Sequence, residues 1–257
     1  MTSLHFRTPR TCNFASLFIA SLIEQSSDLL FSPLLYLLQT TVETTIIFDW
    51  DDTLLSSSWL AQNGLRLDEP SIVPHEARVQ LDVLQDSVIS LLQRAMTFGT
   101  CIVITNAETG WVELSCKKFL PRVQPLLSKL RVLSARSTFE SRFPDSPSDW
   151  KVQAFSQEIH AAYAGRKGEQ RRNLISFGDS IHERAAIHKV TQLMIAQNSN
   201  KTGNDAVKIN VKSVKFVERP TLEQLKRQID LVTNCFGEVV GHAGNLDLML
   251  TISLLYN

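Results

Sequence analysis

Short apolar runs alternate with longer segments of helical periodicity along most of this chain. Runs of Val, Ile, Leu and Phe are typical of buried strands, whereas apolar residues three and four positions apart are typical of helices. The predicted strands are residues 44–48, 100–104, 131–134, 173–177 and 207–217. The predicted helices are residues 76–98, 108–119, 121–130, 149–163, 181–192 and 221–232.

Two of the predicted helices allow a more detailed prediction. Thr221 is expected to cap the amino end of the last helix, because its hydroxyl can accept a hydrogen bond from the first turn. In the longest helix, the apolar residues expected on one buried side are Val79, Val83, Leu84, Val88, Leu91 and Leu92.

The regular alternation of strands and helices determines the predicted fold class. It indicates a mostly parallel sheet with helices packed on both of its faces. We therefore predict an α/β fold, a Rossmann-like three-layer α/β/α domain with a mostly parallel sheet. In such sheets ligands bind at the carboxyl ends of the strands, so functional residues are expected directly after the apolar runs.

Composition and charge narrow the classes of function. The chain has 257 residues, of which 44% are hydrophobic and 20% are charged, as expected for a globular protein. Its 26 basic and 26 acidic residues give no net charge, so no overall field attracts nucleic acid or a membrane surface. Its four cysteines form no CxxC pair and have no zinc-ligand spacing, which favours a reducing compartment over a disulfide framework.

Polar side chains stand directly after the predicted strands, where the fold predicts function. Because the carboxyl ends of parallel strands lie at one edge of a sheet, these side chains are expected to converge. They are Asp49 and Asp51 after the first strand, Thr105 and Asn106 after the second, Asp179 after the fourth, and Lys151 at the start of a helix.

Asp49 and Asp51 form the pair of acids on which the predicted chemistry depends. One carboxylate can attack phosphorus and form an aspartyl-phosphate, while the other protonates the leaving oxygen and then activates water. Two neighbouring carboxylates repel each other, so a cation is needed to hold both near a phosphate. Mg²⁺ suits this role because it takes oxygen ligands, and Asp179 is the natural third ligand.

The remaining polar residues can contact a phosphoryl group. The hydroxyl of Thr105 and a backbone amide at Asn106 can hold phosphate oxygens, and Lys151 can neutralise charge during transfer. Glu183 lies one helical turn after Asp179 and can accept hydrogen bonds from metal-bound water or orient Lys151. The alternatives that remain for the role of Lys151 are Lys117, Lys129 and Lys167.

Four motifs in this order resemble those of the haloacid dehalogenase-like (HAD-like) superfamily of phosphohydrolases. The first is Asp-x-Asp-x-Thr after an apolar strand, present here as Asp-Trp-Asp-Asp-Thr at residues 49–53. The second is an apolar strand ending in Thr-Asn at residues 102–106, and the third is a lysine at a helix start, Lys151. The fourth, Gly-Asp-x-x-x-Asp, is present as Gly-Asp-Ser-Ile-His-Glu at residues 178–183. The resemblance covers residues 44–232.

The resemblance implies a Mg²⁺-dependent phosphoric monoester hydrolase with Asp49 as its nucleophile. Dehalogenases of the superfamily lack an acid two positions after the nucleophile, so Asp51 implies a phosphatase. The implied metal ligands are Asp49, the backbone carbonyl of Asp51 and Asp179, with Glu183 in support. Glu183 stands where the superfamily usually has Asp, which leaves its exact contact open. Asp52 is expected either to face away or to cap the following turn.

Members of the superfamily select substrates with cap insertions, and this chain has room only for a minimal cap. Residues 54–74 are expected to form a loop and a short turn, and residues 137–148 a second loop. An open site of this kind suits a large substrate, such as a phosphorylated protein side chain. Trp59 and Trp111 are expected either to line the entrance or to pack in the core.

The chain is expected to have three parts. Residues 41–234 form the phosphohydrolase core, with an N-terminal extension at residues 1–40 and a C-terminal tail at residues 235–257. Residues 1–23 carry two arginines, no acid and a short apolar stretch, which indicates either a targeting segment or a helix packed on the domain. The expected location is cytoplasmic, with an organelle or the secretory pathway as the alternative. No segment has the length of a transmembrane span.

Two other functions remain open besides the phosphatase. The first is a catalytically inactive HAD-like scaffold that binds a phosphorylated ligand or a protein. The second is a phosphorylation-switch receiver domain, which also uses an aspartate, a threonine and a lysine on a parallel sheet, although Asp179 argues against it. The expected partner of the phosphatase is a phosphorylated substrate, with a protein among the candidates, and nucleic acid is not expected.

Overall fold

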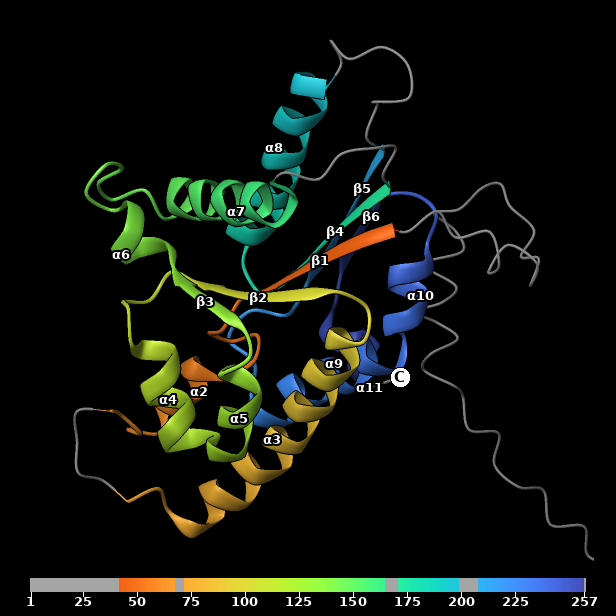
Figure 1. The fold of residues 1–257 in the computed structure, drawn as a ribbon. Helices are drawn as coiled ribbons and strands as arrows, with labels where there is room; N and C mark the ends of the chain where they lie inside the picture. The colour runs from red at the N-terminus through yellow and green to blue at the C-terminus, as the bar shows by residue number, and fades with distance from the viewer. Residues whose placement is uncertain (1–41, 68–71, 165–170, 199–207, 257) are drawn as a thin grey trace, which may run out of the picture.

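The computed structural model describes residues 42–67, 72–164, 171–198 and 208–256 (Figure 1). These residues contain one sheet of six parallel strands in the order β3-β2-β1-β4-β5-β6. The strands are β1 (Val42–Phe48), β2 (Thr100–Thr105), β3 (Arg131–Ser134), β4 (Arg171–Gly178), β5 (Lys208–Lys215) and β6 (Leu246–Met249). The predicted α/β fold is therefore confirmed, and a sixth strand joins the five that were predicted.

Helices cover both faces of this sheet and complete a Rossmann-like three-layer fold (Figure 1). One face carries α6 (Ala135–Phe139), α7 (Pro147–Tyr163) and α8 (Ile181–Asn198). The other face carries α3 (His75–Met96), α9 (Leu222–Asn234) and α10 (Phe236–Gly241). The shorter elements are α2 (Ser57–Gln62), α4 (Trp111–Phe119), η2 (Pro121–Val123), α5 (Gln124–Leu127) and α11 (Ile252–Tyr256).

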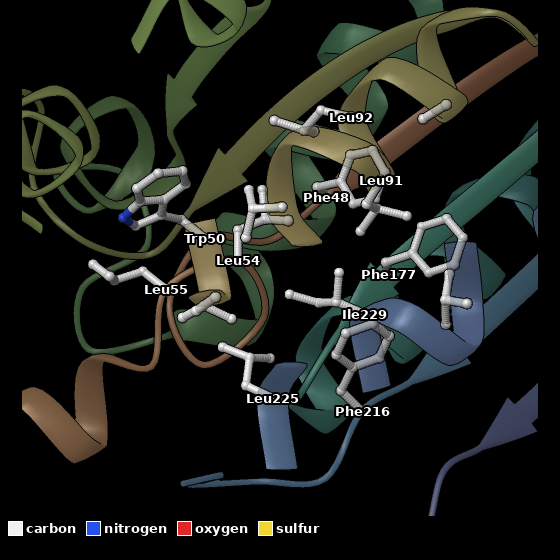
Figure 2. Packing of buried hydrophobic residues seen from close by; sticks show 14 of the residues in the cluster. Phe48, Trp50, Leu54, Leu55, Leu91, Leu92, Phe177, Phe216, Leu225 and Ile229 are labelled. Atoms are coloured by element: carbon white, nitrogen blue, oxygen red, sulfur yellow. The ribbon is translucent and has the colours of Figure 1, made fainter. Parts of the chain in front are cut away.

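An aromatic cluster packs beneath the carboxyl ends of the two central strands. Phe48, Phe177 and Phe216 lie in the core that α3 and α9 cover (Figure 2). The ring of Phe177 stacks on Phe48 with centroids 5.0 Å apart and meets the edge of Phe216 at 6.4 Å. Each buried ring contributes about 2 kcal/mol to stability. Because Phe48 and Phe177 lie at the carboxyl ends of β1 and β4, this packing fixes where the following polar residues begin.

The buried stripe of α3 differs from the predicted one. Val79 and Val83 are 50% and 45% exposed, so the prediction that both lie on the buried side is wrong. The helix advances about 100° per residue, which carries these two positions outside the stripe that faces the sheet. The buried apolar residues of α3 are Ala77, Leu81, Leu84, Val88, Leu91, Leu92 and Ala95.

The predicted cap of α9 is confirmed. The Gln224 N–H donates to the Thr221 hydroxyl at 3.2 Å, and the Thr221 N–H donates back to the Gln224 side chain at 3.0 Å. This reciprocal pair satisfies two N–H groups that the first turn of a helix leaves without partners. The cap therefore fixes where α9 begins, directly after the loop that follows β5.

Residues 235–257 contribute to the core instead of forming a separate tail. β6 pairs in parallel with β5, and its Leu246 and Leu248 are buried. Phe236 of α10 packs on the ring of Phe177, with centroids 5.6 Å apart. The domain boundary predicted before this segment is therefore wrong. A strand of four residues that alternates buried and more exposed positions is too short to give a clear apolar run.

Some predictions fall on parts of the chain that the structure leaves undescribed. The extension at residues 1–40, with its targeting segment, lies outside the described residues. Within the described ranges, no helix combines the length and the apolar character needed to cross a membrane. Between β1 and α3 the described residues contain a single short helix, α2, as the predicted minimal cap requires.

Candidate active site

The strand order reverses between β1 and β4, and the predicted polar residues gather at this point. From β1 the chain moves outward to β2 and β3, whereas β4 begins the other half of the sheet. Asp49 follows β1 and Asp179 follows β4, and the Asp49 N–H donates to the Phe177 carbonyl at 2.9 Å. In open parallel sheets ligands bind at such a reversal, outside the carboxyl ends of the strands.

Lys151 is a buried lysine whose ammonium joins three elements. It is the fifth residue of α7, and its side chain is 1% exposed. Its Nζ donates to Asp49 Oδ1 at 2.6 Å and to the Ile104 carbonyl at 2.7 Å, and it pairs with Glu183 Oε1 at 2.8 Å. These contacts match the three N–H donors of the ammonium. Burial opposes the charge, but Asp49 and Glu183 outweigh it and raise the pKa of Lys151 above its usual range.

Three carboxyl groups lie around this lysine, which is more negative charge than one ammonium can balance. Oxygens of Asp49, Asp179 and Glu183 all lie within 4.8 Å of one another. Burial, with added repulsion from Glu183, raises the pKa of Asp49 well above its usual range despite Lys151, and raises that of Asp179 to about 7. Burial also acts on Glu183, but the ion pair with Lys151 makes the net effect a lowered pKa.

The acidic cluster of Asp49, Asp179 and Glu183 fits a cation that prefers oxygen ligands. Carboxylate oxygens are the ligands that hard divalent cations take in proteins, and a bound cation would offset the excess negative charge. Both carboxylate oxygens of Glu183 are engaged, by Lys151 and by Ser180, whereas Lys151 contacts one oxygen of Asp49, so Asp49 and Asp179 are the residues best able to hold an ion. The predicted contribution of the Asp51 backbone carbonyl stays a prediction.

Gly178 makes room for Glu183 at the junction of β4 and α8. A Cβ atom at this position would lie 2.4 Å from Glu183 Cγ, closer than real carbon atoms approach. Ser180 holds the carboxylate from its other side, since its N–H and its hydroxyl donate to Glu183 Oε2 at 3.1 and 2.5 Å. The sequence Gly-Asp-Ser therefore folds Glu183 back over the end of β4, where it reaches Lys151.

Asp51 lies close to this cluster and is held through both of its carboxyl oxygens. The Trp111 indole N–H donates to Oδ1 at 2.9 Å, and the Thr105 hydroxyl donates to Oδ2 at 3.1 Å. Burial raises the pKa of Asp51, and the hydrogen bond from Trp111 is the largest effect that opposes this rise. Asp51 is thus fixed by donors from two different elements, β2 and α4.

Asp52 is directed toward α2 and caps that helix. Its φ is +52°, in the left-handed region that Asp adopts more readily than most residues. Its carboxylate accepts hydrogen bonds from the Ser58 N–H at 2.9 Å and from the Ser58 hydroxyl. Of the two alternatives predicted for Asp52, capping of the following turn is therefore confirmed.

The side chains of Thr105 and Asn106 are engaged with protein groups in this structure. Asn106 Nδ2 donates to the Pro147 carbonyl at 3.2 Å, so this amide holds the start of α7. The Thr105 hydroxyl accepts from the Ala107 N–H at 2.9 Å while it donates to Asp51. The contacts of Thr105 and Asn106 with a phosphate stay predictions.

The structure also bears on the predictions for the lysines and for Trp111. Among the lysines considered, Lys151 reaches the acids, Lys117 and Lys129 are exposed, and Lys167 lies outside the described residues. Trp111 was predicted to line the entrance or to pack in the core, and its hydrogen bond to Asp51 was missed. The available signal was its position at the start of a helix that follows a functional strand end.

A cavity lies at the other end of the central strands. It has a volume of roughly 420 Å³ and is lined by the amino-terminal half of β1, the segment before β2 and the end of α7, including Thr45, Phe98 and Tyr163. It shares no residue with the acidic cluster. Because parallel sheets bind ligands at the carboxyl ends of their strands, this cavity does not contribute to the candidate active site.

Sequence comparison provides no relative from which a function could be transferred. The sequence matches no protein-family model and no curated protein.

Proposed function

We propose that this protein is a Mg²⁺-dependent phosphatase of the HAD-like type, which hydrolyses phosphate monoesters through an aspartyl-phosphate on Asp49. The observation that carries the proposal is the contact between Asp49 and the buried ammonium of Lys151 inside a cluster of three carboxyl groups. The position of this cluster at the reversal of strand order supports a ligand-binding role. Asp51, held nearby by two donors, supplies the second acid that the chemistry needs.

In the proposed first step, Asp49 attacks phosphorus and the bond from phosphorus to the ester oxygen breaks. Lys151 engages Oδ1 of Asp49, which leaves Oδ2 as the attacking atom. Asp51 gives its proton to the ester oxygen, so the alcohol leaves without a negative charge. The positive charge of Lys151 stabilises the additional negative charge near Asp49 as the phosphoryl group is transferred.

In the proposed second step, Asp51 acts as a base. It takes a proton from a water molecule while that water attacks the phosphorus of the aspartyl-phosphate. The bond between phosphorus and Asp49 breaks, inorganic phosphate leaves, and both carboxyl groups return to their starting states. The two steps therefore use the same pair of acids in complementary roles.

The acidic cluster would hold the metal ion of this phosphatase. Mg²⁺, when bound, would screen the repulsion between Asp49 and a phosphate and polarise the phosphoryl oxygens. Asp49 and Asp179 would hold it, together with the backbone carbonyl of Asp51. Glu183 would keep Lys151 in place and accept hydrogen bonds from water on the ion.

The proposed substrate is a large phosphorylated molecule, such as a protein side chain. The single short helix between β1 and α3 supports this proposal, because it leaves little chain to close over the site. The proposed location is the cytoplasm, where such substrates and Mg²⁺ are both present.

The decisive experiment measures phosphate release from aryl phosphates, sugar phosphates, nucleotides and phosphopeptides, with Mg²⁺ and after its removal by a chelator. We expect the wild type to be active with Mg²⁺ and inactive without it. We expect Asp49→Asn to lower kcat by at least about a thousandfold, because an amide cannot form the intermediate. Asp230→Asn on α9 is the matched control, since this half-exposed carboxylate pairs with Lys226 and should leave activity unchanged.

The outcomes separate this proposal from its rivals. Acid quenching of the wild type should yield a peptide containing Asp49 with the added mass of one phosphoryl group. Near wild-type activity of Asp49→Asn would show that the mechanism is wrong. Binding of a phosphopeptide without turnover would favour the inactive scaffold, and a long-lived aspartyl-phosphate would favour the receiver domain.

A further inference from the structure

We propose that Trp111 is a positioning residue that holds Asp51 in the orientation needed to protonate the leaving group. This inference rests on the proposed phosphatase function. Its basis is the hydrogen bond of 2.9 Å from the Trp111 indole nitrogen to Asp51 Oδ1. Neither residue is part of the acidic cluster of Asp49, Asp179 and Glu183.

The hydrogen bonds from Trp111 and from Thr105 differ in how firmly they orient the carboxyl group of Asp51. The indole N–H of Trp111 is a donor only, so Oδ1 accepts from it whether or not Asp51 carries a proton. The hydroxyl of Thr105 can rotate and can both donate and accept. With Oδ1 occupied, the proton that Asp51 transfers is carried on Oδ2. The transfer then breaks the Oδ2–H bond and forms a bond from hydrogen to the ester oxygen as that oxygen leaves phosphorus.

Without Trp111 the carboxyl group of Asp51 would be held by the hydroxyls of Thr105 and Ser57 alone, and because hydroxyl donors can themselves rotate, it could turn about its Cβ–Cγ bond. Trp111 prevents this rotation, because it fixes Oδ1 from a second element, α4, while Thr105 fixes Oδ2 from β2. Proton transfer requires donor and acceptor to lie within hydrogen-bond distance, so the orientation of the acid controls the rate.

The local sequence gives Trp111 a defined position. Gly110 has a φ of +91°, a conformation that glycine adopts without strain, and this turn delivers Trp111 as the first residue of α4. The Trp111 N–H donates to the Glu108 carbonyl at 3.1 Å, and its side chain packs against the apolar core that α3 and α9 cover. Both ends of the residue are therefore anchored, and the indole N–H is directed at Asp51.

The test compares substrates that differ in their need for a proton. An alkyl phosphate has a poor leaving group that must be protonated, whereas the nitrophenolate of nitrophenyl phosphate leaves readily without a proton. For Trp111→Phe we expect kcat/KM to fall by about thirtyfold on the alkyl ester, a modest share of the usual contribution of general acid catalysis, and by less than about threefold on the aryl ester. Loss of folded protein would lower both values equally, so a positioning role is recognised by the difference.

Two further variants separate the N–H group from the ring. Replacement of Trp111 by benzothienylalanine keeps the shape of the ring and removes the donor, so it should reproduce the selective loss even if Trp111→Phe folds poorly. Trp59→Phe is the matched control, because Trp59 packs against the same core and, among the described residues, the indole that donates to Asp51 is that of Trp111. We expect it to change the two values of kcat/KM equally and little.

A spectroscopic readout does not depend on turnover. The indole ¹H–¹⁵N resonance of Trp111 should shift in Asp51→Asn, where a charged acceptor becomes a neutral one, and that of Trp59 should not. Equal losses on both esters in an active enzyme would overturn the positioning role while the phosphatase stands. A wild type inactive on every ester would overturn the phosphatase and the inference with it, whatever the resonance shows.

Discussion

At the scale of single residues, Lys151 is a buried ammonium that forms ion pairs with two buried carboxyl groups. One ammonium, 1% exposed, contacts Asp49 and Glu183, with Asp179 close by. Burial of a charge is costly unless it is paired, and removal of one partner leaves the others buried without compensation. The lysine therefore contributes to stability as well as to the proposed chemistry.

Lys151→Met should test this double role. We expect it to lower the free energy of unfolding by about 3–5 kcal/mol, because it leaves buried carboxylates without their cation. Lys189→Met is the matched control, since Lys189 is 58% exposed and its ion pair with Asp149 spans 3.9 Å. This control should change stability by less than about 0.5 kcal/mol. Urea titration of both variants measures the difference, and equal stabilities would show that the acids need no lysine.

The positions of the site residues could be predicted from the sequence far better than their side-chain contacts. Asp49 and Asp179 follow predictable strand ends, and Lys151 lies near the start of a predicted helix, so their convergence follows from the parallel fold. The bond from Trp111 to Asp51 could not be predicted in the same way, because it depends on the direction of one side chain after the left-handed turn at Gly110. Sequence periodicity specifies which face a residue occupies, but not which atom its polar group meets.

At the scale of elements, the strand β6 shows how a short segment can be structurally essential. It forms the edge of the sheet beside β5, and Leu246 and Leu248 are buried at 1% and 4% exposure. The same segment brings Asn245, whose side-chain oxygen accepts from the Val211 N–H at 2.9 Å. Residues 245–249 thus bury apolar side chains and supply a hydrogen-bond acceptor for a backbone N–H at the edge of β5.

Leu246→Ala should destabilise the whole fold. We expect a loss of about 2–4 kcal/mol in the free energy of unfolding, because the substitution removes buried methyl groups and leaves a cavity. Met249→Ala on the same strand is the control, since Met249 is 58% exposed and should cost less than about 0.5 kcal/mol. Thermal unfolding followed by circular dichroism would report both. A negligible effect of Leu246→Ala would show that this segment contributes little to the stability of the fold, as expected of a tail.

Prediction of the elements succeeded for five strands, the four-residue β3 included, and failed for β6. The strands β1, β2 and β4 are apolar runs buried on both faces, and they were predicted within a few residues of their ends. β6 has four residues and only two apolar positions facing inward, so no periodicity distinguishes it from a loop. In α3 the helix itself was predicted correctly, but Val79 and Val83 show that an apolar residue on a helix need not face the core.

At the scale of the whole molecule, the acidic cluster is expected to couple the free energy of unfolding to pH. The pKa of Asp179 is raised from its ordinary value of 3.8 to about 7 by burial and by the charge of Glu183. A carboxyl group whose pKa is higher in the folded state stabilises the fold below its ordinary pKa. That stability is lost as the pH rises through about 7, because the buried group must then ionise.

The metal-free protein should therefore lose stability between about pH 4 and pH 7. We expect the free energy of unfolding to fall by up to about 4 kcal/mol across this window from Asp179, because a pKa difference of about three units corresponds to that free energy. Mg²⁺ should reduce the decline, since a cation that binds only the folded state stabilises it and favours the ionised carboxylates. Denaturant titrations at several pH values measure this effect. An equally steep decline in Asp179→Asn would assign it to other groups.

The hydrogen bond between Trp111 and Asp51 also gives the protein a built-in optical reporter. Indole emission responds to charge and water near the ring, and the indole N–H of Trp111 donates to the carboxyl group of the proposed general acid, Asp51. Trp50 lies in a different environment, because it is fully buried and its N–H donates to the Ser115 hydroxyl at 2.9 Å. Ligand binding near Asp51 can therefore be followed by intrinsic tryptophan fluorescence, without a label and without turnover.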